Sequence, residues 1–154
     1  MVTPSPAALA ELKAALGPSG WTEDAQEIAP WLTEWRNKWQ GHTPLMLKPG
    51  STAEVARAVS ICAAHGVAIV PQGGDTGLVG GQIPYGEVLL STRGLRAIRD
   101  VTPLDDAMTV EAGVTLLEAQ QAATAAGRCF PLSLAAEGTA TIGGVISTNA
   151  GGTA

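Results

Sequence analysis

The sequence predicts an α+β fold, in which mixed sheets of short strands are flanked by helices. Three observations support this prediction. Capping signals for helices recur along the chain, apolar runs of strand length lie between the helices, and one segment alternates apolar and polar residues. With 154 residues, the chain is long enough to enclose a hydrophobic core.

Helix-start and helix-stop signals define three helices. A Ser or Thr before the first turn caps its free N–H groups, and a glycine after the last turn ends the helix. The first predicted helix begins at Ser5-Pro6 and stops at Gly17-Pro18. The second begins at the capping box Ser51-Thr-Ala-Glu54 and ends at Gly66. The third begins at the capping box Thr115-Leu-Leu-Glu118 and ends at Ala126, with Gly127 as the stop.

A further helical stretch is predicted around Trp31, Trp35 and Trp39. These residues are spaced four apart, so a helix would place all three on one face. Such a stripe either packs in the core or stacks on a flat ligand, and packing is the more common role. We therefore expect the three tryptophans to pack.

Short apolar runs between the helices predict strands at residues 44–48, 67–70, 88–90, 98–101 and 108–112. The last run alternates apolar and polar residues, so one face of that strand is expected to be buried. We expect the last two strands to pair across the turn at Pro103-Leu-Asp-Asp106.

Composition and charge exclude some classes of partner. The chain is 45% hydrophobic and 15% charged, its net charge is −5, and no cluster of Lys and Arg stands out. This balance argues against nucleic acid, whose phosphates require basic groups, and gives no polybasic membrane signal. No apolar run approaches the roughly 20 residues of a membrane span, and residues 1–6 show no signal peptide.

The metal-ligating residue types are few and scattered. Cys62 and Cys129 have no metal-binding spacing, and the isolated His42 and His65 make neither a metal site nor a catalytic triad. We predict no metal, and we interpret both cysteines as free in a reducing cytosol, with a structural disulfide as the alternative. The predicted location is therefore cytoplasmic.

Two stretches rich in small residues indicate ligand binding. Residues 71–81, with five glycines in eleven positions, directly follow a predicted strand. Backbone N–H groups of such a loop can point together at an anion. Residues 133–154 contain no Lys or Arg and are mostly Gly, Ala, Ser and Thr. The first loop fits neither G-x-G-x-x-G nor the Walker pattern, and tight turns without a ligand are the alternative interpretation.

Both stretches together resemble a known flavoprotein family. Residues 71–81 read PQGGDTGLVGG, and residues 141–152 read TIGGVISTNAGG. In this order they are similar to the FAD-binding (PCMH-type) domain of the vanillyl-alcohol oxidase / p-cresol methylhydroxylase superfamily. Within it, the D-2-hydroxyacid dehydrogenases, which act on 2-hydroxyglutarate, lactate or glycolate, are most similar. The segment Lys48-Pro-Gly-Ser-Thr-Ala-Glu54 and the order of the strands also fit, so the resemblance covers nearly the whole chain.

The resemblance implies FAD, with its pyrophosphate on the first loop and its flavin end near the second. The implied cofactor-binding residues are Pro71, Gly73, Gly74, Asp75, Thr76, Gly77, Gly80 and Gly81 in the first loop, and Pro131, Ser133, Gly138, Thr141, Gly143, Gly144, Asn149 and Gly151 in the second stretch. Some relatives attach flavin through a histidine in or beside the first loop. Because this loop has none, we expect non-covalent FAD.

Chains of this family continue far beyond the motif Asn149-Ala-Gly-Gly152, so we expect the sequence to be truncated at its C-terminus. Residues 1–40 would form an N-terminal helical segment, and residues 41–154 the N-terminal part of the FAD-binding domain. No catalytic residue is assigned here. The parent chain is expected to oxidise a small D-2-hydroxy acid to the 2-oxo acid. A flavin- or nucleotide-binding module without turnover is the alternative, and the electron acceptor and a homodimer are left open.

Overall fold

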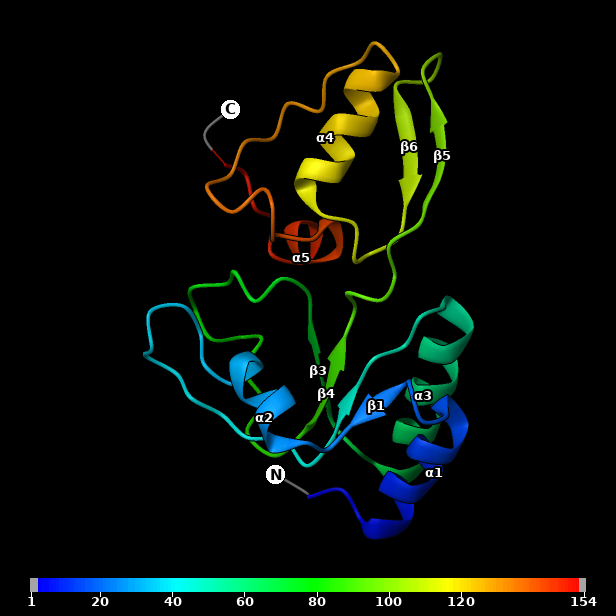
Figure 1. Cartoon of the computed structure of the whole chain (residues 1–154), viewed down its shortest axis with the longest axis vertical. Helices are drawn as coiled ribbons and strands as arrows, with labels where there is room; N and C mark the ends of the chain where they lie inside the picture. Colours follow the sequence, from blue (N-terminus) through cyan, green and yellow to red (C-terminus); the bar gives the residue numbers. More distant parts are fainter. Residues whose placement is uncertain (1–2, 153–154) are drawn as a thin grey trace.

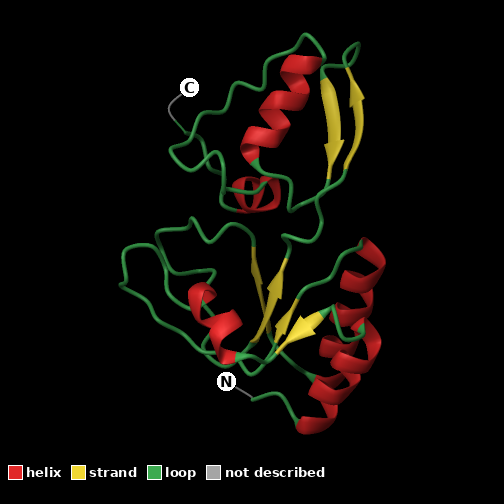
Figure 2. Ribbon diagram, in the orientation of Figure 1, coloured by secondary structure: helices red, strands yellow, loops and turns green. Residues whose placement is uncertain are grey.

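The structure is a computed structural model that describes residues 3–152, and it consists of two lobes (Figure 1). Residues 3–91 form the first lobe and residues 98–152 the second. The chain passes from one to the other after strand β4 (Val88–Ser91) and enters the second lobe at strand β5 (Ile98–Thr102). The mixed α and β content agrees with the predicted class (Figure 2).

A four-stranded sheet organises the first lobe. Its order is β1 (Trp21–Thr22), β2 (Met46–Leu47), β4 and β3 (Ile69–Gln72). The last three strands are parallel, and β1 is antiparallel to β2. All four residues of the central strand β4 are buried. A parallel strand is buried on both sides when helices cover both faces of the sheet.

Two long helices cover one face of this sheet. Helices α1 (Pro6–Leu16) and α3 (Thr52–His65) pack against each other and against β2 and β4. As predicted, Ser5 and Ser51 cap them, and Gly66 ends α3 with φ of 62°. His65 also contacts α1, with its Nε2 2.7 Å from the Glu11 carboxylate.

The core of this face contains ten buried residues, namely Ala8, Leu12, Leu16, Leu45, Leu47, Ala58, Cys62, Val67, Val88 and Leu90. Alternate strand residues point to opposite faces, so Met46 and Leu89 face the other way. There they pack with Ile28 of helix α2 (Ala25–Ile28) and with Trp31 of the short 3₁₀ helix η1 (Ala29–Trp31).

The second lobe has one antiparallel hairpin and two helices. Strands β5 and β6 (Ala107–Val110) form the hairpin predicted from the sequence. Helix α4 (Leu116–Ala125) begins at the predicted capping box, with Thr115 Oγ1 accepting from the Glu118 N–H and Glu118 Oε2 accepting from the Thr115 N–H. The core of this lobe is small: Val114, Leu116, Ala119 and Ile142 are its buried members.

The helix predicted around the three tryptophans does not form, and this prediction is wrong. Only Trp31 lies in a helical turn, and residues 33–40 reverse direction, closed by a bridge between Thr33 and Gln40. The Glu34 carboxylate accepts from backbone N–H groups that a helix would use internally. The packing expectation fails for Trp35, which is 79% exposed.

Helix α5 (Ile142–Ser147) lies in the second small-residue stretch, where the sequence did not predict a helix. Two glycines in six residues oppose helix formation. Tertiary hydrogen bonds hold its start, because the Ile142 N–H donates to the Val114 carbonyl at 2.8 Å and the Gly143 N–H to the Ala112 carbonyl at 2.9 Å. Within residues 3–152, no helix is long and apolar enough to cross a membrane.

Candidate functional site

The first glycine-rich loop leaves the carboxyl end of β3, at the edge of the sheet that faces the second lobe (Figure 1). Asp75 and Gly80 have positive φ values of 55° and 76°. Aspartate is one of the few residues besides glycine that adopt this conformation readily. The loop therefore turns at two points.

Two glutamine side chains bind the loop to itself and to its surroundings. Gln82 Nε2 donates to Asp75 Oδ1 at 3.1 Å and to the Gly77 carbonyl at 2.7 Å. Gln72 Nε2 donates to the Trp31 carbonyl at 2.9 Å and to the Gln82 carbonyl at 3.1 Å. These bonds give a glycine-rich segment a defined shape, and neither glutamine was among the predicted site residues.

The two small-residue stretches meet directly at the boundary between the lobes. A Cβ added to Gly73 would overlap the Thr141 hydroxyl, and one added to Gly74 would overlap the Thr139 carbonyl. The predicted sites in residues 71–81 and 138–144 thus lie side by side. Glycine is required at these two positions because the opposite loop occupies the space of a side chain.

At several other predicted glycines, a side chain would come too close to atoms of the protein itself. A Cβ on Gly77 would lie 2.8 Å from Gln82 Oε1, one on Gly80 2.8 Å from the Trp39 ring, and one on Gly143 2.7 Å from Ala112 Cβ. All three distances are below normal van der Waals contact. At Gly80 and Gly143 the fold itself excludes a side chain, whereas at Gly77 a Cβ would displace the end of the Gln82 side chain.

At three predicted glycines, the protein itself has room for a side chain. A Cβ on Gly81, Gly138 or Gly151 would meet nothing within 4 Å, and none of the three has positive φ. A Cβ on Gly144 would make only an ordinary contact, 3.5 Å from Thr141 Oγ1. These positions leave main chain uncovered, as close approach of a cofactor requires, and Gly138 and Gly144 adjoin the contact between the loops.

Two buried side-chain atoms have no hydrogen-bond partner among residues 3–152, one at the contact between the loops and one in the first lobe. They are Thr141 Oγ1 and Gln72 Oε1, in residues that are 3% and 2% exposed. Buried polar atoms normally have partners, so an orphaned hydroxyl between two loops fits a site completed by another molecule. Thr141 is a predicted site residue.

The remaining predicted residues of the second stretch lie further along the same chain segment. Ser133 Oγ is 3.3 Å from Glu137 Oε1, and a Cβ on Gly152 would overlap the Ser133 carbonyl, so the two ends of the stretch are in contact. Asn149 has a φ of 50° after the end of α5. Pro131 and Thr76 lie in the two loops, in positions that are at least partly exposed.

One arginine missed by the sequence analysis lies near the first loop. Arg93 follows β4, and parallel pairing of Gln72 with Ser91 places the segments after both strands next to each other. The Arg93 guanidinium covers the Trp31 ring, and its Nε lies 3.3 Å from Ser91 Oγ. Burial lowers the pKa of Arg93, and the charge of Asp75 opposes this shift. Burial raises the pKa of Asp75, against hydrogen bonding from Gln82 and the charge of Arg93.

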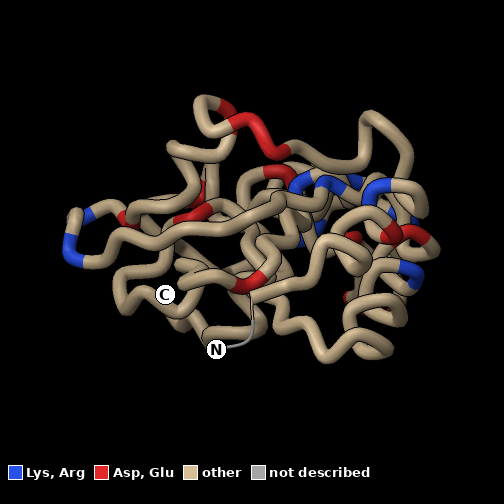
Figure 3. Tube along the Cα trace, turned by 90° about the horizontal axis from the view of Figure 1, so that it is seen from below, with Lys and Arg blue, Asp and Glu red and all other residues tan. Residues whose placement is uncertain are grey.

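The charges around the site are otherwise sparse. Figure 3 shows Lys and Arg in small groups over the chain, several of them beside Asp or Glu. Among residues 3–152, no three His, Cys, Asp or Glu side chains are grouped to hold a metal ion. Both cysteines are free, Cys62 buried and Cys129 exposed. A ligand at the loop boundary would therefore meet mainly backbone groups and hydroxyls, with the Asp75 carboxylate in the first loop and Arg93 near that carboxylate.

Two glycine-rich loops without Lys or Arg, brought together from two lobes, leave main chain uncovered in a way that is typical of proteins that bind a nucleotide-type cofactor. Comparison with known proteins identifies the cofactor. Residues 43–154 match a family model described as "FAD binding domain". The chain belongs to this family, and its cofactor is FAD.

Relatives by sequence agree with this assignment, and solved structures agree with the fold. A protein of Oryza sativa subsp. indica named probable D-2-hydroxyglutarate dehydrogenase, mitochondrial, is 42% identical over 141 residues, which are 91% of this chain and 25% of the relative. An alkyldihydroxyacetonephosphate synthase superposes with a TM-score of 0.86 over 98% of this chain and 33% of that one, at 21% identity. A substrate-bound p-cresol methylhydroxylase gives 0.73 over 91% of this chain and 28% of that one, at 20% identity.

The chain thus has the predicted PCMH-type fold and spans about a quarter of the length of the curated relatives it matches. The rice relative and several others are named as mitochondrial proteins. The cytoplasmic location predicted from the sequence is therefore wrong. That prediction rested on the free cysteines and on the lack of a recognised signal peptide. Free cysteines indicate a reducing compartment but do not say which one.

Proposed function

We propose that this chain is the FAD-binding part of a flavin-dependent oxidoreductase that oxidises a D-2-hydroxy acid to the 2-oxo acid. FAD, when bound, supplies the two-electron oxidation. The observation that supports the proposal is the boundary where Gly73 and Gly74 contact the segment 139–141, with the uncovered main chain of Gly138 next to it. The names of the relatives supply the substrate class.

In this proposal, residues 41–154 carry the cofactor contacts, and residues 1–40 support them as an N-terminal segment. Backbone N–H groups of Gly73 to Gly77 and the Thr76 hydroxyl hold the pyrophosphate. Arg93 adds the positive charge that the loop itself lacks. Thr141, Gly143, Gly144, Asn149 and Gly151 line the opposite side, with Pro131 and Ser133 toward the flavin. No histidine lies in the first loop, so we propose that FAD is bound non-covalently.

The open glycines allow a test that separates cofactor contact from folding. Gly138→Val places a side chain where the protein leaves space, so the thermal unfolding of the FAD-free protein should change little. If the cofactor lies on this surface, overpacking by about 1–3 kcal/mol should weaken FAD binding by roughly tenfold or more. Titration of the FAD-free, intact protein with FAD, followed by flavin fluorescence, measures this.

Gly50→Ala is the matched control, because Gly50 lies outside both loops and its added Cβ would meet only Glu54 Oε2 at 3.8 Å. It should leave FAD affinity and stability unchanged. Unchanged affinity in Gly138→Val would contradict the proposed site. Oxidation of D-2-hydroxyglutarate, D-lactate and glycolate by the intact protein then tests the substrate class, and no turnover of any of them would favour a binding module.

A further inference from the structure

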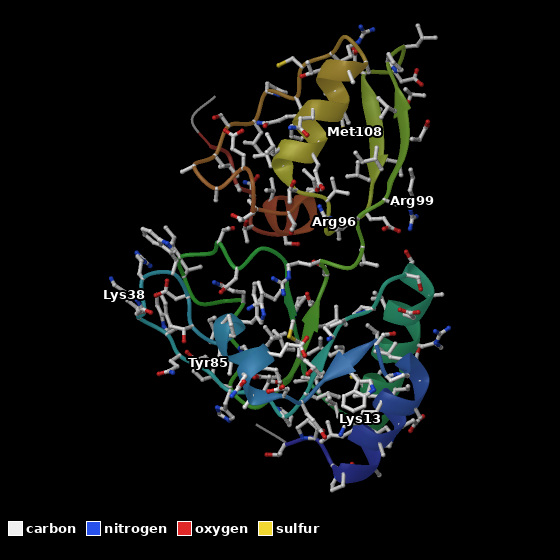
Figure 4. All side chains as sticks on the ribbon, in the orientation of Figure 1. Lys13, Lys38, Tyr85, Arg96, Arg99 and Met108 are labelled. Carbon is white, nitrogen blue, oxygen red and sulfur yellow. The ribbon has the colours of Figure 1, made fainter. Side chains whose placement is uncertain are left out.

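Residues 33–40 form a compact segment that turns back on itself beside the first glycine-rich loop. The Thr33–Gln40 bridge closes it, and the Glu34 N–H donates to the Trp39 carbonyl at 3.2 Å. Asn37 makes the reversal with a φ of 56°. In Figure 4, Lys38 lies at the outer end of this segment and points away from the lobe.

A buried carboxylate fixes the shape of the segment. Glu34 is 0% exposed, and its two oxygens accept from the Arg36 N–H at 2.7 Å and the Lys38 N–H at 2.6 Å. Burial acts to raise the pKa of Glu34, but these hydrogen bonds and the nearby charges of Arg36 and Lys38 outweigh it, and the pKa is lowered. The carboxylate is thus ionised at neutral pH and bound to the backbone around it.

This fixed segment contacts the first loop at two points. The Trp39 ring lies against Gly80, where an added Cβ would approach ring atoms to 2.8 and 2.9 Å. Arg36 Nη2 donates to the Leu78 carbonyl, and the guanidinium lies 5.8 Å from the Trp39 ring centre. Leu78 and Val79, between these points, are 44% and 80% exposed, so their own side chains hold the loop only weakly.

We propose that residues 33–40 are a clamp that holds the 77–81 part of the first loop in the conformation that binds FAD, with Trp39 and Arg36 as positioning residues. The inference rests on the proposed location of the FAD site. A loop with five glycines loses much conformational entropy when it is ordered. Contacts that order it before the cofactor arrives improve affinity, because that entropy is not lost on binding.

The test compares two tryptophans of one segment in the intact protein. Trp39→Ala removes the ring from Gly80, whereas Trp35→Ala removes an exposed ring that is not among the close contacts of the loop glycines. Hydrogen exchange of amides 77–81 in the FAD-free protein reports the order of the loop. FAD titration reports the cofactor affinity, and Trp39→Phe tests whether a flat ring is sufficient.

We expect Trp39→Ala to accelerate exchange at amides 77–81 and to weaken FAD binding, each by roughly tenfold, equivalent to about 1.4 kcal/mol. Trp39→Phe should keep most of the loop protection and of the FAD affinity, and Trp35→Ala should change neither quantity. Arg36→Ala should act in the same direction as Trp39→Ala with a smaller effect, and it replaces that variant if Trp39→Ala does not fold.

Unchanged exchange in Trp39→Ala and Arg36→Ala would overturn the clamp. So would faster exchange with unchanged FAD affinity, because the loop order would then not serve the cofactor. If the unmodified protein bound no FAD, the proposed function would fail instead, and the exchange rates of the FAD-free protein would still decide whether the segment orders the loop.

Discussion

The two lobes bury their strands to very different extents. In the first lobe the central strand β4 is buried along its whole length, with helices on both faces of the sheet. In the second lobe no residue of strands β5 and β6 is fully buried, and Ile98 is 40% exposed. A parallel sheet requires cover on both faces, whereas a two-stranded hairpin has little stability of its own.

The difference suggests that the two lobes contribute differently to the proposed cofactor site. The first lobe holds its glycine-rich loop with glutamine, tryptophan and arginine side chains. The second lobe presents its loop mainly through main-chain hydrogen bonds between α4, α5 and residues 112–116. The first lobe is thus the more stable support, and the second is the part expected to open first.

Core substitutions should show the largest difference. Leu47 and Leu116 are both 0% exposed, one in each lobe. Leu47→Ala should lower the free energy of unfolding by about 3–5 kcal/mol, because its surroundings are closely packed on all sides. Leu116→Ala should cost about 2–3 kcal/mol, since its half-exposed neighbours can collapse into the cavity. Urea unfolding with hydrogen exchange measures both, and equal losses with exchange rising in both lobes would show that the lobes unfold as one unit.

The contact between the lobes should give the next largest effect. Gly74→Val places a branched side chain on the Thr139 carbonyl, so it should separate the loops and lower stability by about 1–3 kcal/mol, with loss of FAD binding. Gly81→Ala is the control, because its Cβ meets nothing within 4 Å and stability should change by less than about 0.5 kcal/mol. Thermal melts and flavin absorbance test both variants. Equal melting temperatures for the two would contradict the contact.

Removing a helix cap should have a smaller effect in each lobe. Thr115→Ala and Ser51→Ala should each cost roughly 1 kcal/mol, because each hydroxyl accepts an N–H at the start of its helix. The loss for Thr115 should exceed that for Ser51, since the Thr115 hydroxyl also contacts Glu118 Oε2 at 2.9 Å. Chemical denaturation of Thr115→Ser, which keeps a hydroxyl, provides the control. A Ser51→Ala loss larger than that of Thr115→Ala would reverse the expected order.

Acidification should give the smallest difference between the lobes. The pKa of Glu111 is lowered by a hydrogen bond from the Ala97 N–H and by Arg99, and that of Glu118 by the Thr115 N–H and Arg96. A carboxyl with a lowered pKa stabilises the folded state at neutral pH, and this contribution disappears as the pH falls from the ordinary glutamate value through the folded one. The second lobe should therefore lose stability in that range.

In the first lobe, Asp75 opposes the loss of stability at low pH. The pKa of Asp75 is raised by burial, so the folded state binds its proton more tightly and gains stability as the pH falls from the raised value through the ordinary aspartate value. Glu27 and Glu34 act in the same sense as the pair in the second lobe, because their pKa values are lowered. Amide protection, corrected for the slower intrinsic exchange at lower pH, should fall first in α4 and β6 as the pH is lowered from 7. Asp75→Asn should remove the stability that the first lobe gains from protonation of Asp75. If both lobes opened at the same pH in the unmodified protein, the proposed difference in their acid stability would be wrong.

The sequence predicted the elements that local signals define. The helices capped by Ser51 and Thr115 and the hairpin around the turn at 103–106 formed as expected, because capping and turn preferences act within a few residues. The helix expected around Trp35 failed, because the hydrogen bonds of Glu34 depend on the folded environment. Helix α5 was missed because its start is held by residues 112 and 114, far away in the sequence.

The sequence identified the loops of the candidate site but not the side chains that support those loops. Residues 71–81 and 138–144 were identified, and the structure places them together. Their glycines serve two purposes that the sequence does not distinguish: Gly74 makes room for the opposite loop, and Gly138 leaves main chain uncovered. Gln82 was missed because no sequence pattern shows that its side chain binds back to Asp75 and Gly77 of its own loop. Arg93 was missed because it comes near Asp75 only when β3 and β4 pair.

The position of the tryptophans has a spectroscopic consequence. All four lie between residues 21 and 39, in the first lobe, and three of them carry a cation over the ring, namely Lys13 on Trp21, Arg93 on Trp31 and Arg36 on Trp39. Intrinsic tryptophan fluorescence therefore reports on that lobe alone. The second lobe contains no tryptophan, and a flavin bound at the proposed site would absorb light that the first lobe emits.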